Sequence, residues 1–140
     1  MRIGDRGLMI KKLTLLIAML IATSAWAEWT MIVQSEDEEK KWYLDIESIK
    51  SNKDYRYAWI LMDLLIPYNG MTSSKTYYEV HCEVPEWLKT KAFIAYEARM
   101  GEGDIQARLT PEEDQAIQYP APNSINEEIV STICHLPSSD

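Results

Sequence analysis

The sequence predicts an α+β fold in which an antiparallel sheet of five to six strands carries a C-terminal helix on one face. Three observations lead to this prediction. Alternating apolar and polar residues recur between residues 28 and 100, a helical apolar pattern occupies residues 124–136, and the chain has two cysteines, Cys82 and Cys134. Strands and helix follow one another in separate blocks, which is typical of α+β domains.

Residues 1–27 have the pattern of a cleaved signal peptide. Its parts come in the expected order: a basic start (Lys11, Lys12), an apolar middle (residues 13–22) and a small-residue cleavage pattern (Ala25, Ala27). Cleavage is therefore expected between Ala27 and Glu28. The apolar segment reaches about half of the roughly 20 residues that a transmembrane helix needs. We expect a periplasmic or secreted protein with no membrane span, and no lipid anchor, because no cysteine follows the cleavage point.

The remaining residues, 28–140, are expected to form a single acidic domain with one core. They contain 10 Lys and Arg against 21 Asp and Glu, a net charge of −11. Nucleic acids and anionic lipids are bound by clustered basic side chains, so the composition argues against both as main partners. A basic partner suits the negative charge of this domain better than a nucleic acid or an anionic lipid does.

The first predicted element is a hairpin of residues 28–34 and 40–45 around the acidic turn 36–39. The four turn residues are consecutive and lack the spacing of an EF-hand loop, which favours a solvated turn over a calcium site. Residues 45–49 predict a turn or one helical turn, with Asp45 capping backbone amides. Residues 50–54 predict a polar loop.

Residues 55–66 form the most strand-like run of the chain, and both of its faces are largely apolar. We therefore predict a central strand covered on both sides, followed by a turn at Asn69 and Gly70. Asp63 is the one charged residue on its otherwise apolar and aromatic face of this strand. A catalytic role is the alternative, but pairing with a basic neighbour is favoured.

Two further strands are predicted at residues 72–84 and 87–100. In the first, one face is expected to meet the core (Tyr78, Val80, Cys82, Val84) and the other to point away (Tyr77, Glu79, His81, Glu83). In the second, alternate residues are expected on one face (Leu88, Thr90, Ala92, Ile94, Tyr96, Ala98). A glycine turn at 101–104, an acidic turn at 112–114 and a short last strand at 115–119 follow.

The C-terminal helix begins at a capping box, with Ser124 as N-cap and Glu127 at the third helical position. Isoleucines recur every four residues from Ile125, and Cys134 lies beside them on the same apolar stripe. Cys82 and Cys134 therefore face each other across the core, and an exported chain favours their disulfide. Closing this loop of 52 residues would stabilise the fold by about 4 kcal/mol through loop entropy.

The sequence predicts neither a metal site nor a catalytic site. His81-Cys82 and Cys134-His135 supply zinc-ligand types, but neighbours on a strand point to opposite faces and an oxidising compartment removes the thiolates. No metal, no cofactor and no catalytic residue are expected. The chain has no Gly-x-Ser-x-Gly elbow, no phosphate-binding glycine loop and no His-Glu-x-x-His motif. Its abundant carboxylates alone do not indicate a glycosidase pair.

Aromatic residues are the remaining signal, since the chain has eight tyrosines and five tryptophans. A helix covers only one face of a sheet, so some of these rings are expected on the other face. The candidate binding face consists of Tyr55, Tyr57, Tyr77 and Trp87. Such a face suits a protein partner or self-association into a homodimer.

The ordered set of motifs resembles the surface-adhesin protein E-like family. The matching segments are an early Glu28-Trp29 strand, residues 42–49 (Trp42 to Ile49), 57–63 (Tyr57 to Asp63), 74–82 (Ser74 to Cys82) and 95–103 (Ala95 to Gly103), and the helix start Pro122-Asn123-Ser124 that leads to Cys134. The resemblance implies an exported bacterial domain, an antiparallel sheet and a C-terminal helix held by a disulfide. The family's namesake is an outer-surface adhesin for host matrix and plasma proteins. Here the lipoprotein cysteine of a surface-anchored member is missing.

The sequence as a whole predicts an exported, non-enzymatic binding module that contacts host-matrix or envelope proteins. One alternative is a small periplasmic enzyme or enzyme inhibitor that uses carboxylates, which would gather Asp63, Glu79 or His81 in a concave pocket. The other is a structural, dimerising envelope protein. A flat convergence of aromatic rings would favour the binding module.

Overall fold

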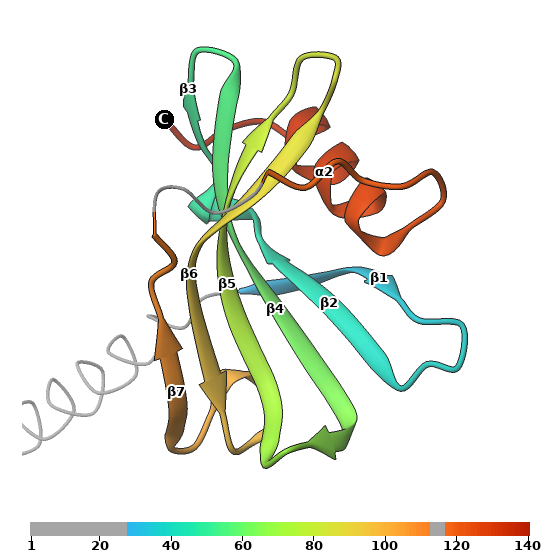
Figure 1. Ribbon diagram of the computed structural model, residues 1–140, viewed down its shortest axis with the longest axis vertical. Coiled ribbons are helices and arrows are strands. Elements are labelled where there is room, and N and C mark those ends of the chain that lie inside the picture. The colour runs from blue at the N-terminus through green and yellow to red at the C-terminus, as the bar shows by residue number, and fades with distance from the viewer. Residues whose placement is uncertain (1–27, 113–116) are drawn as a thin grey trace, which may run out of the picture.

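A curved antiparallel sheet with one helix across its upper half forms the protein (Figure 1). The computed structural model describes residues 28–112 and 117–140. The elements are β1 (Trp29–Gln34), β2 (Lys40–Asp45), η1 (Ile46–Ser48), β3 (Lys50–Asn52), β4 (Tyr55–Tyr68), β5 (Met71–His81), β6 (Trp87–Tyr96), η2 (Arg99–Gly101), β7 (Ile105–Leu109) and α2 (Ile125–His135). The leader (residues 1–27), residues 113–114 of the predicted acidic turn and residues 115–116 of the predicted strand 115–119 lie outside the described residues.

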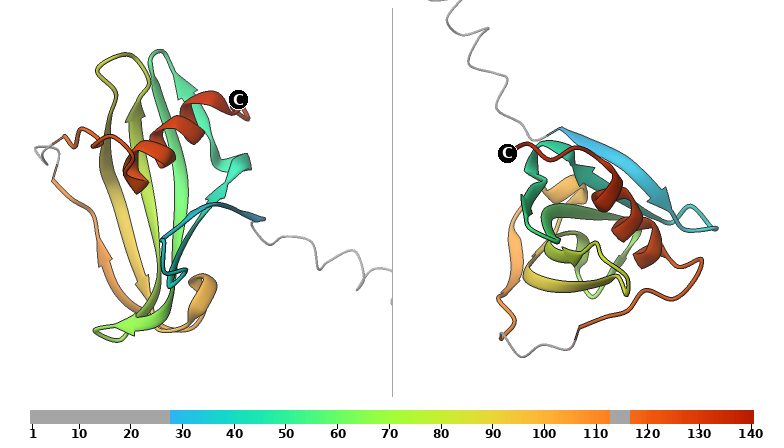
Figure 2. Two further views of the ribbon diagram at one scale, coloured as in Figure 1. Left: turned by 90° about the vertical axis from the view of Figure 1, so that its right-hand side faces the viewer. Right: turned by 90° about the horizontal axis from the view of Figure 1, so that it is seen from above.

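The strands follow one another across the sheet in the order β1-β2-β4-β5-β6-β7, and all pairs are antiparallel. Strand β3 pairs with the first residues of β4. The predicted α+β class, antiparallel sheet and packed C-terminal helix are confirmed. From two directions, α2 lies on one side of the molecule and β7 on the other (Figure 2).

The core lies between α2 and the sheet face that we call the helix face. Ala58, Ile60, Val80 and Leu88 project from three strands, and the helix contributes three residues to meet them (Ile129, Val130, Ile133). All seven are buried. The isoleucine stripe predicted from the sequence is thus the surface that α2 buries.

Both ends of α2 are tied down. The Ser124 Oγ accepts a hydrogen bond from the Glu127 backbone N–H, as the capping box predicts. At the other end, Arg56 Nη1 donates to the carbonyls of Ile133 and Leu136. An arginine from β4 therefore satisfies carbonyls that a helix end leaves without an intrahelical partner.

The predicted disulfide joins the end of β5 to the last turn of α2. The Cys82–Cys134 S–S distance is 2.10 Å and the two Cα atoms are 5.6 Å apart. Both cysteines pack against the core cluster. The bond therefore fixes the helix to the sheet at the point where the helix ends.

A bulge in β6 overturns the prediction of one continuous face from Leu88 to Ala98. Tyr77 pairs with Ala92 while Tyr78 pairs with Thr90, so Lys91 is an extra residue in β6. Side-chain alternation restarts there. Leu88 and Thr90 share the helix face, whereas the apolar residues after Lys91 that were expected beside them lie on the opposite face (Ala92, Ile94, Tyr96).

Several other local predictions were wrong. Residues 50–52 form β3, so the expected polar loop is reduced to the tight turn before Tyr55. The Asp45 side chain makes no capping hydrogen bond to η1; its carbonyl instead accepts from Ser48 Oγ at 2.6 Å. Val84, expected in the core, is 90% exposed because β5 ends at His81.

The last strand of the sheet was also misplaced. Strand β7 occupies Ile105–Leu109, and its five residues are all exposed. Of the predicted strand 115–119, the described part contributes a single bridge, in which Leu88 and Gln118 exchange two backbone hydrogen bonds. The predicted turn at Asn69 and Gly70 is present, with positive φ values of 48° and 81°.

Candidate functional site: the aromatic face

The sheet face opposite α2 carries a continuous row of aromatic rings. We define the aromatic face as Tyr55, Tyr57, Trp59, Tyr77, His81 and Trp87. Residues that pair across antiparallel strands point to the same side, and five of the six are joined by the pairs 55–81, 59–77 and 81–87. Tyr57 lies on this side because it alternates with Tyr55 and Trp59 along β4. All six side chains are half-buried, so each ring has one surface against its neighbours and another open to solvent.

The upper part of this face is a three-ring cluster at the ends of β4, β5 and β6. His81 stacks on Trp87 with ring centroids 5.3 Å apart and an interplanar angle of 16°. Tyr55 lies 5.2 Å from His81 and 5.6 Å from Trp87. These separations are within the range of favourable aromatic pairs, so the rings stabilise one another and form a firm surface.

The middle of the face is a second cluster of three rings. Tyr77 stacks on Trp59 at 5.0 Å and on Tyr57 at 6.1 Å. Burial raises the pKa of Tyr77 and, together with the negative charge of Glu79, the pKa of Tyr57. Both phenols are protonated at neutral pH, as tyrosines with an ordinary pKa also are, and the raised values extend this state to higher pH.

Charged groups frame the rings. Lys91 Nζ lies 3.5 Å from Glu79 Oε2, and both side chains belong to the aromatic face side of the sheet. Further down, the Lys75 amine lies 5.1 Å from the Tyr96 ring centroid and 5.6 Å from that of Trp29. Since β1 and β5 are separated by two strands in the sheet, this contact shows how strongly the sheet curves.

The structure brings the four predicted binding residues together as two neighbouring pairs, Tyr55 with Trp87 and Tyr57 with Tyr77. Sequence reasoning left out two members of the same row. Trp59 has the same strand parity as Tyr57, which could have identified it. His81 also points to this face, but its contact with Trp87 depends on the pairing of β5 with β6, which no local pattern indicates.

Asp63 is buried beneath η2 and holds that turn in place. Its carboxylate accepts hydrogen bonds from Arg99 Nε at 3.0 Å, Arg99 Nη2 at 2.5 Å and the Met100 backbone N–H at 2.8 Å. Ser73 Oγ donates to the Ala98 carbonyl and accepts from the Gly101 N–H. The predicted pairing of Asp63 with a basic neighbour is confirmed, and Asp63 has a structural role.

The three groups proposed for a catalytic alternative do not converge. Asp63 is bound to Arg99, Glu79 pairs with Lys91, and His81 stacks on Trp87. Three hollows lined by described residues, of about 520, 570 and 290 Å³, include none of the three groups. Within residues 28–112 and 117–140, no three His, Cys, Asp or Glu side chains gather closely enough to hold a metal ion.

The fold and this face define a small disulfide-held domain that displays one side of its sheet. The surface-adhesin protein E family profile matches residues 29–135. The chain therefore belongs to the surface-adhesin protein E family. A comparison with curated protein sequences finds no match.

Solved structures of Haemophilus influenzae protein E share this fold. One crystal form is 18% identical, with a TM-score of 0.55, and the match covers 80% of this chain and 91% of the other. A second structure is 19% identical, with a TM-score of 0.53 and coverages of 80% and 87%. The predicted family resemblance is confirmed. No helix in the described part of the chain is long and apolar enough to cross a membrane.

Proposed function

We propose that the protein is an exported, non-enzymatic binding module that contacts other proteins through its aromatic face. Six rings over three adjacent strands, each half open to solvent, are the observation that carries the proposal. Tyrosine and tryptophan are enriched at the centres of protein interfaces, because they present large rigid surfaces with one polar tip. Membership of an adhesin family supports a protein partner from the host matrix or the cell envelope.

Export is part of the same proposal. The leader-like segment 1–27 would direct the chain out of the cytoplasm, with cleavage between Ala27 and Glu28. The Cys82–Cys134 disulfide is the bond that an oxidising compartment maintains. A periplasmic or secreted location follows from both.

The test is capture of envelope and host-matrix proteins on the immobilised, oxidised protein, purified after export. We expect specific capture by the wild type and at least tenfold weaker binding by Tyr57→Ser/Trp87→Ser, since exposed aromatic anchors each contribute about 1–4 kcal/mol at interfaces. The matched control, Leu65→Ser/Tyr68→Ser, also removes two exposed apolar side chains but lies at the far end of β4.

Two results would overturn the proposal: no captured protein, or equal loss of binding in both variants. A dimer that persists at low protein concentration, with no other protein captured, would assign the aromatic face to a second copy of the chain. Turnover of a substrate by the purified protein would contradict the non-enzymatic part.

A further inference from the structure

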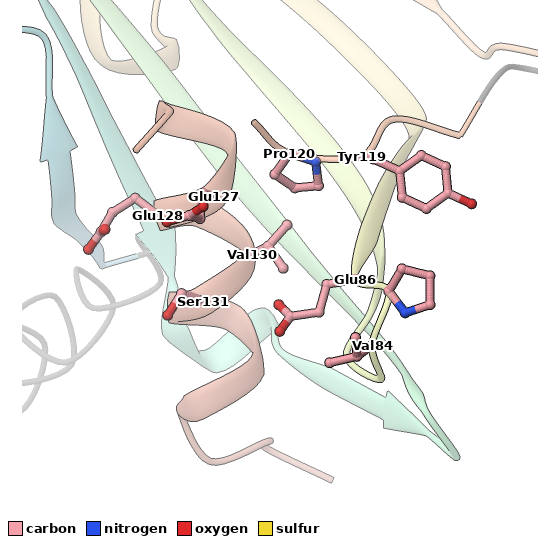
Figure 3. Close-up of a pocket in the computed structure, with 9 residues that line it drawn as sticks. Val84, Glu86, Tyr119, Pro120, Glu127, Glu128, Val130 and Ser131 are labelled. Carbon is pink, nitrogen blue, oxygen red and sulfur yellow. The ribbon is translucent and has the colours of Figure 1, made fainter. Parts of the chain in front are cut away.

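A groove separates the first turns of α2 from the tight turn that joins β5 to β6. Its volume is about 520 Å³. Val84 and Glu86 line it from the turn, Val130 and Glu127 line it from the helix, and Tyr119 and Pro120 border it from the segment that precedes the helix (Figure 3). The groove faces away from the aromatic face, because Val130 belongs to the buried helix stripe on the other side of the sheet.

The groove walls offer apolar surface to solvent. Val84 is 90% exposed and Tyr119 is 62% exposed, while Pro120 lies above Val130. Valine, tyrosine and proline side chains in this arrangement would bury the aliphatic part of a bound chain. No packing role within the described domain accounts for so exposed a valine beside a hollow.

Carboxylates supply the charge of this groove, and no basic residue lines it. Glu86 extends from the turn towards Val130, whereas Glu127 approaches from the helix (Figure 3). Neither makes an ion pair with any residue of the described part of the chain. An acidic first turn stabilises a helix, which accounts for Glu127. It does not account for Glu86, which comes from another element and points into the same space.

A second hollow continues the acidic surface across the helix. It is about 570 Å³ in volume, shares Glu127 and Glu128 with the first, and adds Glu36 from the β1–β2 turn. Its apolar lining includes Val33 and Ile125, and it too has no basic residue. Carboxylates therefore recur along a path that crosses the start of α2, with apolar surface between them. We call these two hollows the acidic trough.

We propose that the acidic trough binds a basic segment of a partner protein, with lysine or arginine side chains lying along it. Their aliphatic stems would cover Val84, Tyr119 and Pro120, while their charged ends would reach Glu86 and Glu127. This division of apolar stem and charged end matches the composition of the trough. A second copy of the chain does not suit it, because residues 28–140 carry a net charge of −11.

A labelled peptide of four Ala-Lys repeats tests this proposal by fluorescence anisotropy at low salt, with four Ala-Gln repeats as the neutral comparison. The oxidised protein, purified after export, should bind the first peptide and not the second. Glu86→Gln/Glu127→Gln keeps the side-chain shapes and should weaken binding at least tenfold. The control Glu47→Gln/Glu102→Gln removes two exposed carboxylates outside the trough and should change affinity less than threefold.

Amide shifts in nuclear magnetic resonance spectra should move at Val84, Glu86 and Val130 when the Ala-Lys peptide is added, and stay fixed at Tyr57. The proposal is overturned if the peptide does not bind, if the neutral peptide binds equally well, or if both glutamine pairs weaken binding equally. Tyr57→Ser/Trp87→Ser should leave peptide binding unchanged, so this proposal and the proposed function can fail separately.

Discussion

At the scale of single residues, the carboxylates of this protein differ in role because their burial and their partners differ. Asp63 is 1% exposed and accepts hydrogen bonds from three N–H groups, whereas Glu86 and Glu127 border a hollow that no basic residue lines. A buried carboxylate is retained only where donors compensate its lost hydration. Burial and hydrogen-bond partners therefore distinguish a carboxylate with a structural role from carboxylates that can bind a ligand.

Asp63→Ala should lower the free energy of unfolding by about 3 kcal/mol, because a buried hydrogen-bonded charge is removed and the Met100 N–H loses its acceptor. Urea unfolding of the oxidised protein measures the loss. Glu102→Ala, an exposed carboxylate in the adjoining turn, should change stability by less than about 0.5 kcal/mol. Equal effects of the two substitutions would contradict the role assigned to Asp63.

Tyr57 and Tyr77 of the aromatic face should ionise late, because the pKa of each is raised. Burial raises the pKa of Tyr57, and the charge of Glu79 raises it further. A pKa raised in the folded state means that the contribution of Tyr57 to stability is complete below its ordinary pKa of about 10 and is lost as pH rises through the folded value. Stability should therefore decline on the alkaline side.

Absorbance titration of phenolate formation tests whether these tyrosines ionise at higher pH than the others. Glu79→Gln should shift one late tyrosine to lower pH, and Tyr57→Phe should remove that tyrosine from the late group. Glu83→Gln, which alters an exposed carboxylate beyond the end of β5, should leave the titration unchanged. If all eight tyrosines ionised together near pH 10, the packed arrangement of these rings would be wrong.

At the scale of elements, sequence periodicity predicted those strands and helices whose apolar pattern is long. Strand β4 and helix α2 were identified with their buried faces. The Cys82–Cys134 bond followed from the alternation of the strand that leads to Cys82 and from the apolar stripe of α2. Strand β3 is three polar residues, so its strand character comes only from pairing with β4. The bulge at Lys91 reverses the faces of β6 and leaves no mark in local composition.

Strand β7 was missed although Ile105, Ala107 and Leu109 alternate with polar residues, because this stripe is short and all five residues of the strand are exposed. The candidate site was predicted only in part, because some of its contacts depend on how the strands pair. Tyr55, Tyr57, Tyr77 and Trp87 were found from strand parity, but the stacking of His81 on Trp87 depends on register between strands. The acidic trough lies between three distant segments and could not be found from the sequence.

Removing the disulfide with Cys82→Ser/Cys134→Ser should lower the free energy of unfolding by about 4 kcal/mol, as expected for freeing a loop of 52 residues. Hydrogen exchange should rise first in α2, which the bond ties to β5, and later in the central strands. As a control, hydrogen exchange in the reduced wild-type protein should match hydrogen exchange in the double variant. Loss of β4 protection before α2 protection would contradict this order.

The whole molecule presents two different surfaces on opposite sides of one sheet. The side with α2 carries the core, the disulfide and the acidic trough, and the other carries the aromatic face. The sheet thus serves as a rigid support for both, since its central strands are joined along their length. Adhesin family membership and the open rings together support contact with proteins through the aromatic face.

Hydrogen exchange on the complex with a captured protein tests this central claim most directly. We predict that the partner slows exchange in residues 55–59 of β4, 77–81 of β5 and the first residues of β6, while the β4–β5 hairpin end at 65–70 stays unchanged. Protection confined to the hairpin end or to β7, with the aromatic strands unaffected, would contradict the account.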